Sequence, residues 1–194
     1  MPKTVIALVN RKGGTGKTTS AGYLAQIFHN HEGVTGIDLD PDQSWLKWHR
    51  SGVLPYEVIV GDRDDLHGQI SNLGNNVVVI DTPPNDEAVV FKVAGVADEV
   101  IIPLAPTTFD LGRLVTTMKT VADVERLRGR PLASILLTRW NPNLNVAQEV
   151  IALLEEREAP LLNARIRQLT RYTEFTTPNY LSEYEAVLAE LEVI

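Results

Sequence analysis

The sequence predicts an α/β protein with a doubly wound, mostly parallel sheet and helices on both faces. Three observations support this fold class: short β-branched runs recur along the chain, stretches with helical spacing separate them, and several runs are apolar at nearly every position. Runs that are apolar throughout are typical of parallel strands buried on both faces. Strands that alternate with helices indicate a doubly wound sheet.

Six strands are expected, each from a short run of apolar and β-branched residues. They are Thr4–Val9, Val34–Asp38, Tyr56–Val60, Val77–Asp81, Glu99–Pro103 and Leu132–Thr138. Six helices are expected where apolar residues recur with helical spacing. They are Thr18–His29, Gln43–Arg50, Asp86–Val96, Leu111–Leu127, Asn145–Arg157 and Tyr180–Leu191. The turn-rich segments Asn72–Asn76 and Arg139–Asn145 merely join predicted elements, so we expect a single domain over residues 1–194.

Length and composition exclude several classes of protein. The 194 residues, 44% of them hydrophobic and 22% charged, are ordinary for one globular domain and unlike a fibrous or wholly disordered chain. The absence of cysteine excludes disulfides, a thiolate nucleophile and Cys-ligated zinc or iron–sulfur centres. No apolar run approaches the roughly 20 residues of a membrane span. We therefore expect a cytoplasmic protein.

Charge is distributed unevenly along the chain. The net charge of −7 on average disfavours a polyanionic partner such as DNA. Residues 126–171, however, contain eight arginines and four glutamates. One part of the molecule is therefore expected to be basic although the whole is acidic.

The most specific motif is V-N-R-K-G-G-T-G-K-T-T, residues 9–19, between the first strand and the first helix. Glycines allow consecutive backbone N–H groups to point at phosphate oxygens, and the helix N-terminus adds its dipole. Lys17 can reach the β- and γ-phosphates of a nucleotide, and the Thr18 hydroxyl can ligate Mg²⁺. The predicted nucleotide contacts in this loop are Gly13, Gly14, Thr15, Gly16, Lys17, Thr18 and Thr19.

Two other predicted strands end in carboxylates. One leads into Asp38 and Asp40, and the other, Val77–Ile80, is followed by Asp81. Ligands bind at the carboxyl edge of a parallel sheet, so both sets of acids are candidates for the site. Mg²⁺ prefers oxygen ligands and keeps several waters, and Asp81 alone could hold it directly or through water. For Asp40, which precedes Pro41, capping of the next helix is the alternative role.

The form K-G-G-x-G-K-T resembles the deviant Walker A motif of the ParA/MinD family of P-loop ATPases. Lys12 is the additional lysine, and Arg11 stands where the general motif has its first glycine. The segment I-D-L-D-P-D-Q-S, residues 37–44, is similar to the family's second acidic motif, D-x-D-P-Q, although Asp42 stands where the family commonly has Gln. Val77–Asp81 has the Walker B pattern.

The resemblance continues in the same order along the chain. Thr82–Pro84 is similar to the family's nucleotide-sensing switch, and Ala97–Pro106 resembles its A-D-x-V-[IL]-I-P-x-x-P segment. The likeness is strong to Pro106 and weak after Arg139. Trp45–Trp48 resembles the small ParA proteins of the ParF type, to which the chain is most similar.

The resemblance implies ATP and Mg²⁺ as cofactors, and Mg²⁺-dependent ATP hydrolysis. Lys12 would reach across a nucleotide-sandwich homodimer to the partner's phosphates, Asp40 would orient or activate the attacking water, and Asp38 would support the metal region. The alternative for Lys12 is a solvated loop residue. The residues thus assigned are Lys12, Lys17 and Asp40 for catalysis, Thr18, Asp38 and Asp81 for the metal, and Pro103 and Thr138 for the adenine pocket.

Among functions, the resemblance implies a partition ATPase that dimerises with ATP, binds non-specific DNA on the nucleoid, and is released when a ParB-like partner stimulates hydrolysis. The candidate DNA contacts are Arg139, Arg165, Arg167 and Arg171. Ion pairs with nearby glutamates are the alternative role for these arginines. Other ParA-like ATPases position carboxysomes, chemoreceptor arrays or conjugation machinery, and no residue separates those cargos.

Two other classes fit the sequence less well. A MinD-like membrane-associated ATPase needs a basic amphipathic helix, whereas Leu181–Ile194 contains four glutamates and no Lys or Arg. A metabolic enzyme on the same scaffold is disfavoured, because a nitrogenase-iron-protein relative needs cysteine ligands and a dethiobiotin-synthetase-like ligase does not usually carry the additional lysine.

Overall fold

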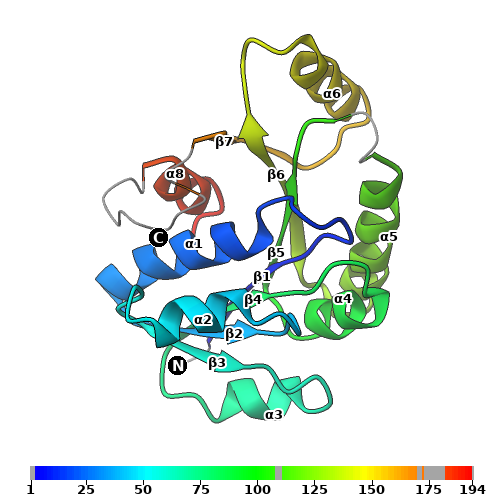
Figure 1. Ribbon diagram of the computed structural model, residues 1–194. Coiled ribbons are helices and arrows are strands. Elements are labelled where there is room, and N and C mark those ends of the chain that lie inside the picture. The colour runs from blue at the N-terminus through cyan, green and yellow to red at the C-terminus, as the bar shows by residue number, and fades with distance from the viewer. Residues whose placement is uncertain (1–2, 108–110, 170–171, 173–181, 194) are drawn as a thin grey trace.

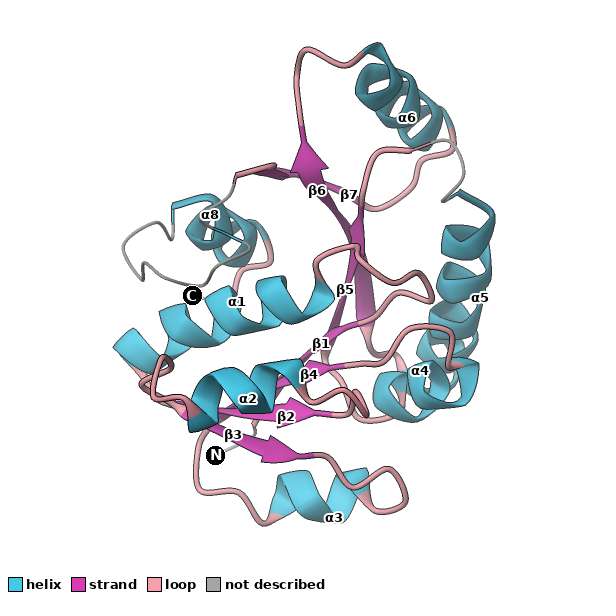
Figure 2. Ribbon diagram, viewed as in Figure 1, coloured by secondary structure: helices cyan, strands magenta, loops and turns pink. Residues whose placement is uncertain are grey.

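The computed structural model describes residues 3–107, 111–169, 172 and 182–193. These residues form a seven-stranded sheet in the order β3-β2-β4-β1-β5-β6-β7, and every pair of neighbouring strands is parallel (Figure 2). The predicted fold class is therefore confirmed. The strands are β1 (Thr4–Leu8), β2 (Val34–Asp38), β3 (Glu57–Val60), β4 (Val77–Asp81), β5 (Glu99–Leu104), β6 (Leu132–Trp140) and β7 (Leu161–Arg167).

Helices cover both faces of the sheet (Figure 1). One face carries α1 (Lys17–His31), α2 (Ser44–Arg50) and α8 (Ser182–Glu190). The other carries α3 (Leu66–Ser71), α4 (Glu87–Ala94), α5 (Leu111–Arg128) and α6 (Asn145–Glu156). Strand β1 shows why both layers are needed: Ile6 and Leu8 pack under the first layer, whereas Val5 and Ala7 pack under the second. Burial of these alternating side chains on both faces is the main favourable contribution to the free energy of folding.

The predicted elements agree with the observed ones to within two residues at each described end. The predicted helix Tyr180–Leu191 begins outside the described residues. Two elements were missed. Strand β7 buries only Leu162 and Ile166 fully, so its seven residues lack the continuous apolar run of the central strands. Helix α3 has six residues, too few to show helical periodicity, and its start depends on Asp65, which accepts a hydrogen bond from the Gly68 amide.

Candidate functional site

The candidate site lies where three neighbouring strands end. Leu8 of β1, Asp81 of β4 and Asp38 of β2 are register partners, and each is the last residue of its strand. The phosphate-loop motif, the segment after β4 and the segment after β2 therefore leave the sheet side by side. In open parallel sheets this carboxyl edge is where ligands bind.

The loop between β1 and α1 has the backbone that the glycine-rich motif predicts. Gly14 and Gly16 have φ angles of 74° and 89°, a left-handed conformation that side chains disfavour. Gly16 directly precedes α1 and carries no side chain that could cap the helix. The first backbone N–H groups of α1 are consequently oriented for an anion, and the helix dipole favours negative charge there.

Three buried polar side chains hold this loop against the sheet. The Asn10 amide nitrogen donates to the Pro103 carbonyl at 2.7 Å, and its Oδ1 accepts from the Lys12 amide at 2.9 Å. The Thr138 hydroxyl donates to the Thr15 carbonyl at 2.7 Å. The Thr82 hydroxyl donates to the carbonyl of Leu8, also at 2.7 Å. The ends of β4, β5 and β6 thus fix the shape of the loop.

Asn10 was not identified from the sequence as a residue that holds the loop. A polar residue placed directly after a predicted apolar strand could have indicated such a role. Pro103 and Thr138, the two residues predicted to lie near an adenine base, both contact the loop, and Thr138 also lines a cavity beside the start of α1. Their contact with a base stays a prediction. In the structure Pro103 supports Asn10 through its carbonyl, and Thr138 supports Thr15 through its hydroxyl.

Lys17 is buried at the centre of the loop, with 6% of its surface exposed. Its Nζ donates to the carbonyl oxygen of Lys12 at 3.2 Å. Burial lowers the pKa of Lys17, while the charges of Asp81 and Asp40 act in the opposite direction. A buried ammonium group beside a nest of amides has a strong affinity for phosphate, because an anion replaces the solvation that the amine has lost.

Asp81 and Thr18 form the part of the site that fits Mg²⁺. The Thr18 hydroxyl donates to Asp81 Oδ2 at 2.6 Å, whereas Asp81 Oδ1 is buried without a hydrogen-bond partner among the described residues. Burial raises the pKa of Asp81 to about 7, an effect that Asp38 and Asp40 increase and that Thr18 and Lys17 oppose. An unsatisfied carboxylate oxygen beside a threonine hydroxyl is suited to a divalent cation.

The protein supplies few other metal ligands here. Within the described ranges no group of three or more His, Asp or Glu side chains is placed to hold a metal.

Asp38 and Asp40 organise the segment after β2. Asp38 accepts hydrogen bonds from the amides of Asp40 at 3.0 Å and Leu46 at 3.1 Å, so each carboxylate oxygen binds one backbone N–H. Burial nevertheless raises the pKa of Asp38, with the amides acting in the opposite direction. Asp40 is half-buried and its Oδ1 accepts from the amide of Asp42 at 3.0 Å. Asp38 shapes the segment that presents Asp40, and direct support of a metal by Asp38 stays a prediction.

A cavity lies beside the start of α1. Gly16 and Thr19 line it from one side, Arg139 and Arg167 from another, and Tyr184 closes part of it. Tyr184 stacks on the buried Tyr23 with ring centroids 5.2 Å apart. The Tyr184 hydroxyl lies 3.2 Å from the hydroxyl of the buried Ser20. The cavity is thus next to the phosphate loop and has both polar and apolar lining residues, as ligand sites commonly have.

The sequence of this chain matches a model of a known protein family. A model of that family, described as the CobQ/CobB/MinD/ParA nucleotide binding domain, matches residues 6–176. The chain belongs to this family. The maintenance of carboxysome distribution protein A of Gloeobacter kilaueensis is 34% identical over 168 residues, covering 84% of this chain and 76% of that protein. The chromosome-partitioning ATPase Soj of Thermus thermophilus is 26% identical over 191 residues. That match covers 77% of this chain and 74% of Soj.

A solved structure shares the fold of this chain. A protein from Borrelia burgdorferi described as a plasmid partition protein, in a structure bound to AMPPNP, superposes with a TM-score of 0.79 at 19% identity and covers 100% of both chains. The likeness in fold therefore extends over the whole chain.

Among the described residues, the three arginines predicted to contact DNA each have a different environment. A guanidinium nitrogen of Arg139 lies 4.0 Å from the point where a Cβ would stand on Gly14, so Arg139 lies beside the phosphate loop. Arg167 forms an ion pair with Glu183. Arg165 is half-buried, and burial lowers its pKa although the charges of two glutamates oppose the effect. Arg171 lies outside the described residues.

Helix α8 is acidic in its first turn, with Glu183 and Glu185. None of the helices in the described part of the chain is both long and apolar enough to cross a membrane.

Proposed function

We propose that this protein is a ParA-type partition ATPase. In this proposal ATP binding drives formation of a homodimer, the dimer binds non-specific DNA, and hydrolysis stimulated by a ParB-like partner reverses both steps. The observation that carries the proposal is the register of Leu8, Asp81 and Asp38, which brings a phosphate loop and two acidic strand ends to one edge of the sheet. The relatives named as partition proteins support the same conclusion.

Each part of the site has a role in this reaction. The amides of the loop and Lys17 would bind the phosphates of ATP, with the Lys17 amine exchanging the Lys12 carbonyl for phosphate oxygen. Thr18 and Asp81 would hold Mg²⁺, which neutralises charge on the phosphates. Asp40 would orient the water that attacks the γ-phosphate, and Lys12 of the opposing copy would stabilise the charge that develops there.

The cavity beside α1 is the proposed site of the base. Its aromatic wall suits a stacked ring, and Arg139 lies between this cavity and the phosphate loop. This position also suits a contact of Arg139 with nucleotide, in addition to its predicted contact with DNA.

DNA binding by this chain remains a proposal that draws on family membership. Non-specific binding needs only a local cluster of cations and falls steeply with salt, so the net charge of −7 does not forbid it. The candidates for DNA contact are Arg139, Arg165 and Arg171. Arg167 would first have to leave Glu183. We also propose a single ATPase domain over residues 1–194 and a cytoplasmic, nucleoid-associated location.

In a second candidate function, the same ATP-dependent dimerisation serves to position a cargo other than a plasmid or chromosome. It is favoured by the relative in Gloeobacter kilaueensis, which is named for carboxysome distribution and is 34% identical to this chain. The chemistry of the site would be the same, and the difference would lie in the partner that stimulates hydrolysis.

Binding to random-sequence duplex DNA at two salt concentrations, with ATP, ADP or no nucleotide, tests the proposal. We expect binding only with ATP, and a marked loss of affinity when salt is raised from about 50 to 200 mM. Equal DNA binding with ATP, with ADP and without nucleotide would contradict the proposed control of DNA binding by ATP. Failure to bind DNA at low salt with ATP would contradict the partition function and favour a switch that acts on a protein partner.

A further inference from the structure

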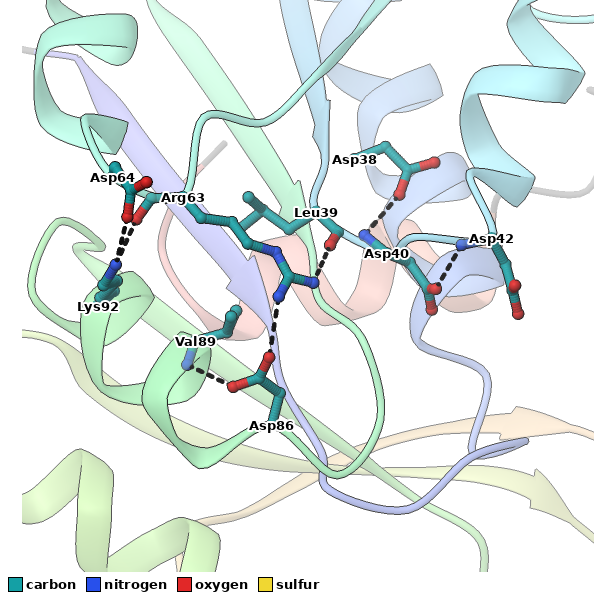
Figure 3. A network of polar contacts seen from close by, with 9 residues as sticks. All are labelled: Asp38, Leu39, Asp40, Asp42, Arg63, Asp64, Asp86, Val89 and Lys92. Atoms are coloured by element: carbon teal, nitrogen blue, oxygen red, sulfur yellow. Dashed lines mark hydrogen bonds and ion pairs between the residues drawn. The ribbon is translucent and has the colours of Figure 1, made fainter.

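Arg63 connects two parts of the site that are distant in sequence. It lies in the loop after β3, and its Nη2 donates to the Leu39 carbonyl at 2.8 Å, while its Nη1 donates to Asp86 Oδ2 at 3.0 Å (Figure 3). Leu39 directly precedes Asp40, the proposed water-orienting residue. Asp86 is the N-cap of α4, and its other oxygen, Oδ1, accepts from the Val89 amide at 3.0 Å.

The position of Arg63 is itself fixed by its neighbours. The Gly61 amide donates to the Asp38 carbonyl at 2.9 Å, and a Cβ on Gly61 would collide with the side chain of Leu39. Lys92 of α4 donates to the Arg63 carbonyl at 2.7 Å. The loop after β3 is thus held against the segment after β2 and against α4 at the same time.

The start of α4 is also tied to the phosphate loop. The Asn85 amide donates to the Arg11 carbonyl at 2.9 Å, and Arg11 forms an ion pair with Glu87 at 3.4 Å. A displacement of the phosphate loop on nucleotide binding would therefore reach α4 through Arg11, and would reach the Asp40 segment through Asp86 and Arg63.

We propose that Arg63 is a positioning residue for the hydrolytic step, which couples the N-terminus of α4 to the alignment of Asp40. This inference rests on the proposed function. The Arg63 and Asp86 side chains are 37% and 30% exposed, and ion pairs of such exposure contribute little to stability. The pair can therefore break and re-form as α4 moves, and its loss is expected to alter catalysis without unfolding the protein.

The chain offers variants that separate this role from simple structural support. Asp86→Asn retains an oxygen to cap Val89 and replaces the oxygen that accepts from Arg63 with an amide group, which cannot accept. Arg63→Gln removes the same pair from the other side. Asp64→Asn is the matched control, because it removes the neighbouring ion pair with Lys92 and leaves the Arg63 contacts in place.

Steady-state hydrolysis and nucleotide affinity give the first readout. We expect Arg63→Gln and Asp86→Asn to lower kcat by roughly 10–100-fold, as small misalignments of reacting groups do, with the Kd for ATP changed less than about twofold. The double variant should lose no more than either single variant, and Asp64→Asn should resemble the wild type. Wild-type kcat in both single variants, or a loss of ATP affinity equal to the loss of kcat, would overturn the positioning role.

Hydrogen–deuterium exchange of the nucleotide-free protein gives a readout that needs no hydrolysis. Asp86→Asn directly changes the N-cap of α4 and its contact with Arg63, and touches no residue of the segment after β2. It should nevertheless speed exchange at the amides of Asp40, Asp42 and Gln43, whereas Asp64→Asn should not. If Asp86→Asn changes exchange in α4 alone, the coupling is wrong, whatever the hydrolysis rates are. If the wild type releases no phosphate from ATP, the proposed function fails, and the exchange result still decides the coupling.

Discussion

Replacing Lys17 with alanine is expected to weaken ATP binding by roughly 10–100-fold, the usual cost of one charge-assisted contact of about 1.5–3 kcal/mol. The amine is buried, and among the described residues its hydrogen-bond partner is a carbonyl oxygen, that of Lys12, at 3.2 Å. Phosphate is a better partner for it than a neutral carbonyl. Titration with a fluorescent ATP analogue measures the effect.

The exposed Lys47 of α2 provides the control, since Lys47→Ala removes one positive charge away from the loop. The loss in Lys17→Ala is not expected to come from unfolding, because removing a buried amine also removes the cost of burying it. Unchanged affinity in Lys17→Ala would show that the loop binds phosphate without this lysine, contrary to the proposed site.

Replacing Asp40 is expected to lower the rate of ATP hydrolysis by roughly 10²–10⁵-fold and to leave ATP binding intact. Asp40→Asn is the sharper variant, because it retains an oxygen for the hydrogen bond from the Asp42 amide and so preserves the local turn. Asp40→Ala should show the same loss of rate, and both should accumulate the ATP-bound dimer. Phosphate release and nucleotide titration measure the two effects.

Asp42→Ala is the matched control, since the Asp42 side chain is exposed and lies two residues after Asp40. It should hydrolyse ATP at the wild-type rate. Hydrolysis at that rate in Asp40→Asn and Asp40→Ala would remove Asp40 from the mechanism and leave only its hydrogen bond with the Asp42 amide, because the N-cap of α2 is Gln43 and not Asp40.

The elements that could be predicted from sequence are those with a strong local signal. Val77–Ile80 has no polar residue and becomes a fully buried strand, and the glycine-rich loop takes the left-handed φ angles at Gly14 and Gly16. Because the strands are parallel, the acids at their carboxyl ends had to share one edge. Edge strand β7 and the short helix α3 lacked such signals.

Long-range contacts of single side chains could not be predicted. Asn10 and Arg63 act through carbonyl groups of Pro103 and Leu39, and no spacing in the sequence records these pairings. Arg139 was grouped with the other arginines from their density along the chain, and its position beside the phosphate loop, at the end of β6, could not be predicted. Charge counted along a chain does not reveal which face the charge occupies.

The mass of the protein in solution, measured by light scattering with ATP, ADP or no nucleotide, tests the central claim most directly. Asp40→Ala with ATP is expected to have twice the chain mass of 21.5 kDa, and the ADP and nucleotide-free samples are expected to be monomers. Adding Lys12→Ala to Asp40→Ala should abolish the ATP-dependent dimer. A monomer in every sample would contradict the ATP-driven switch, and a dimer that survives Lys12→Ala would contradict the role of Lys12 across the interface.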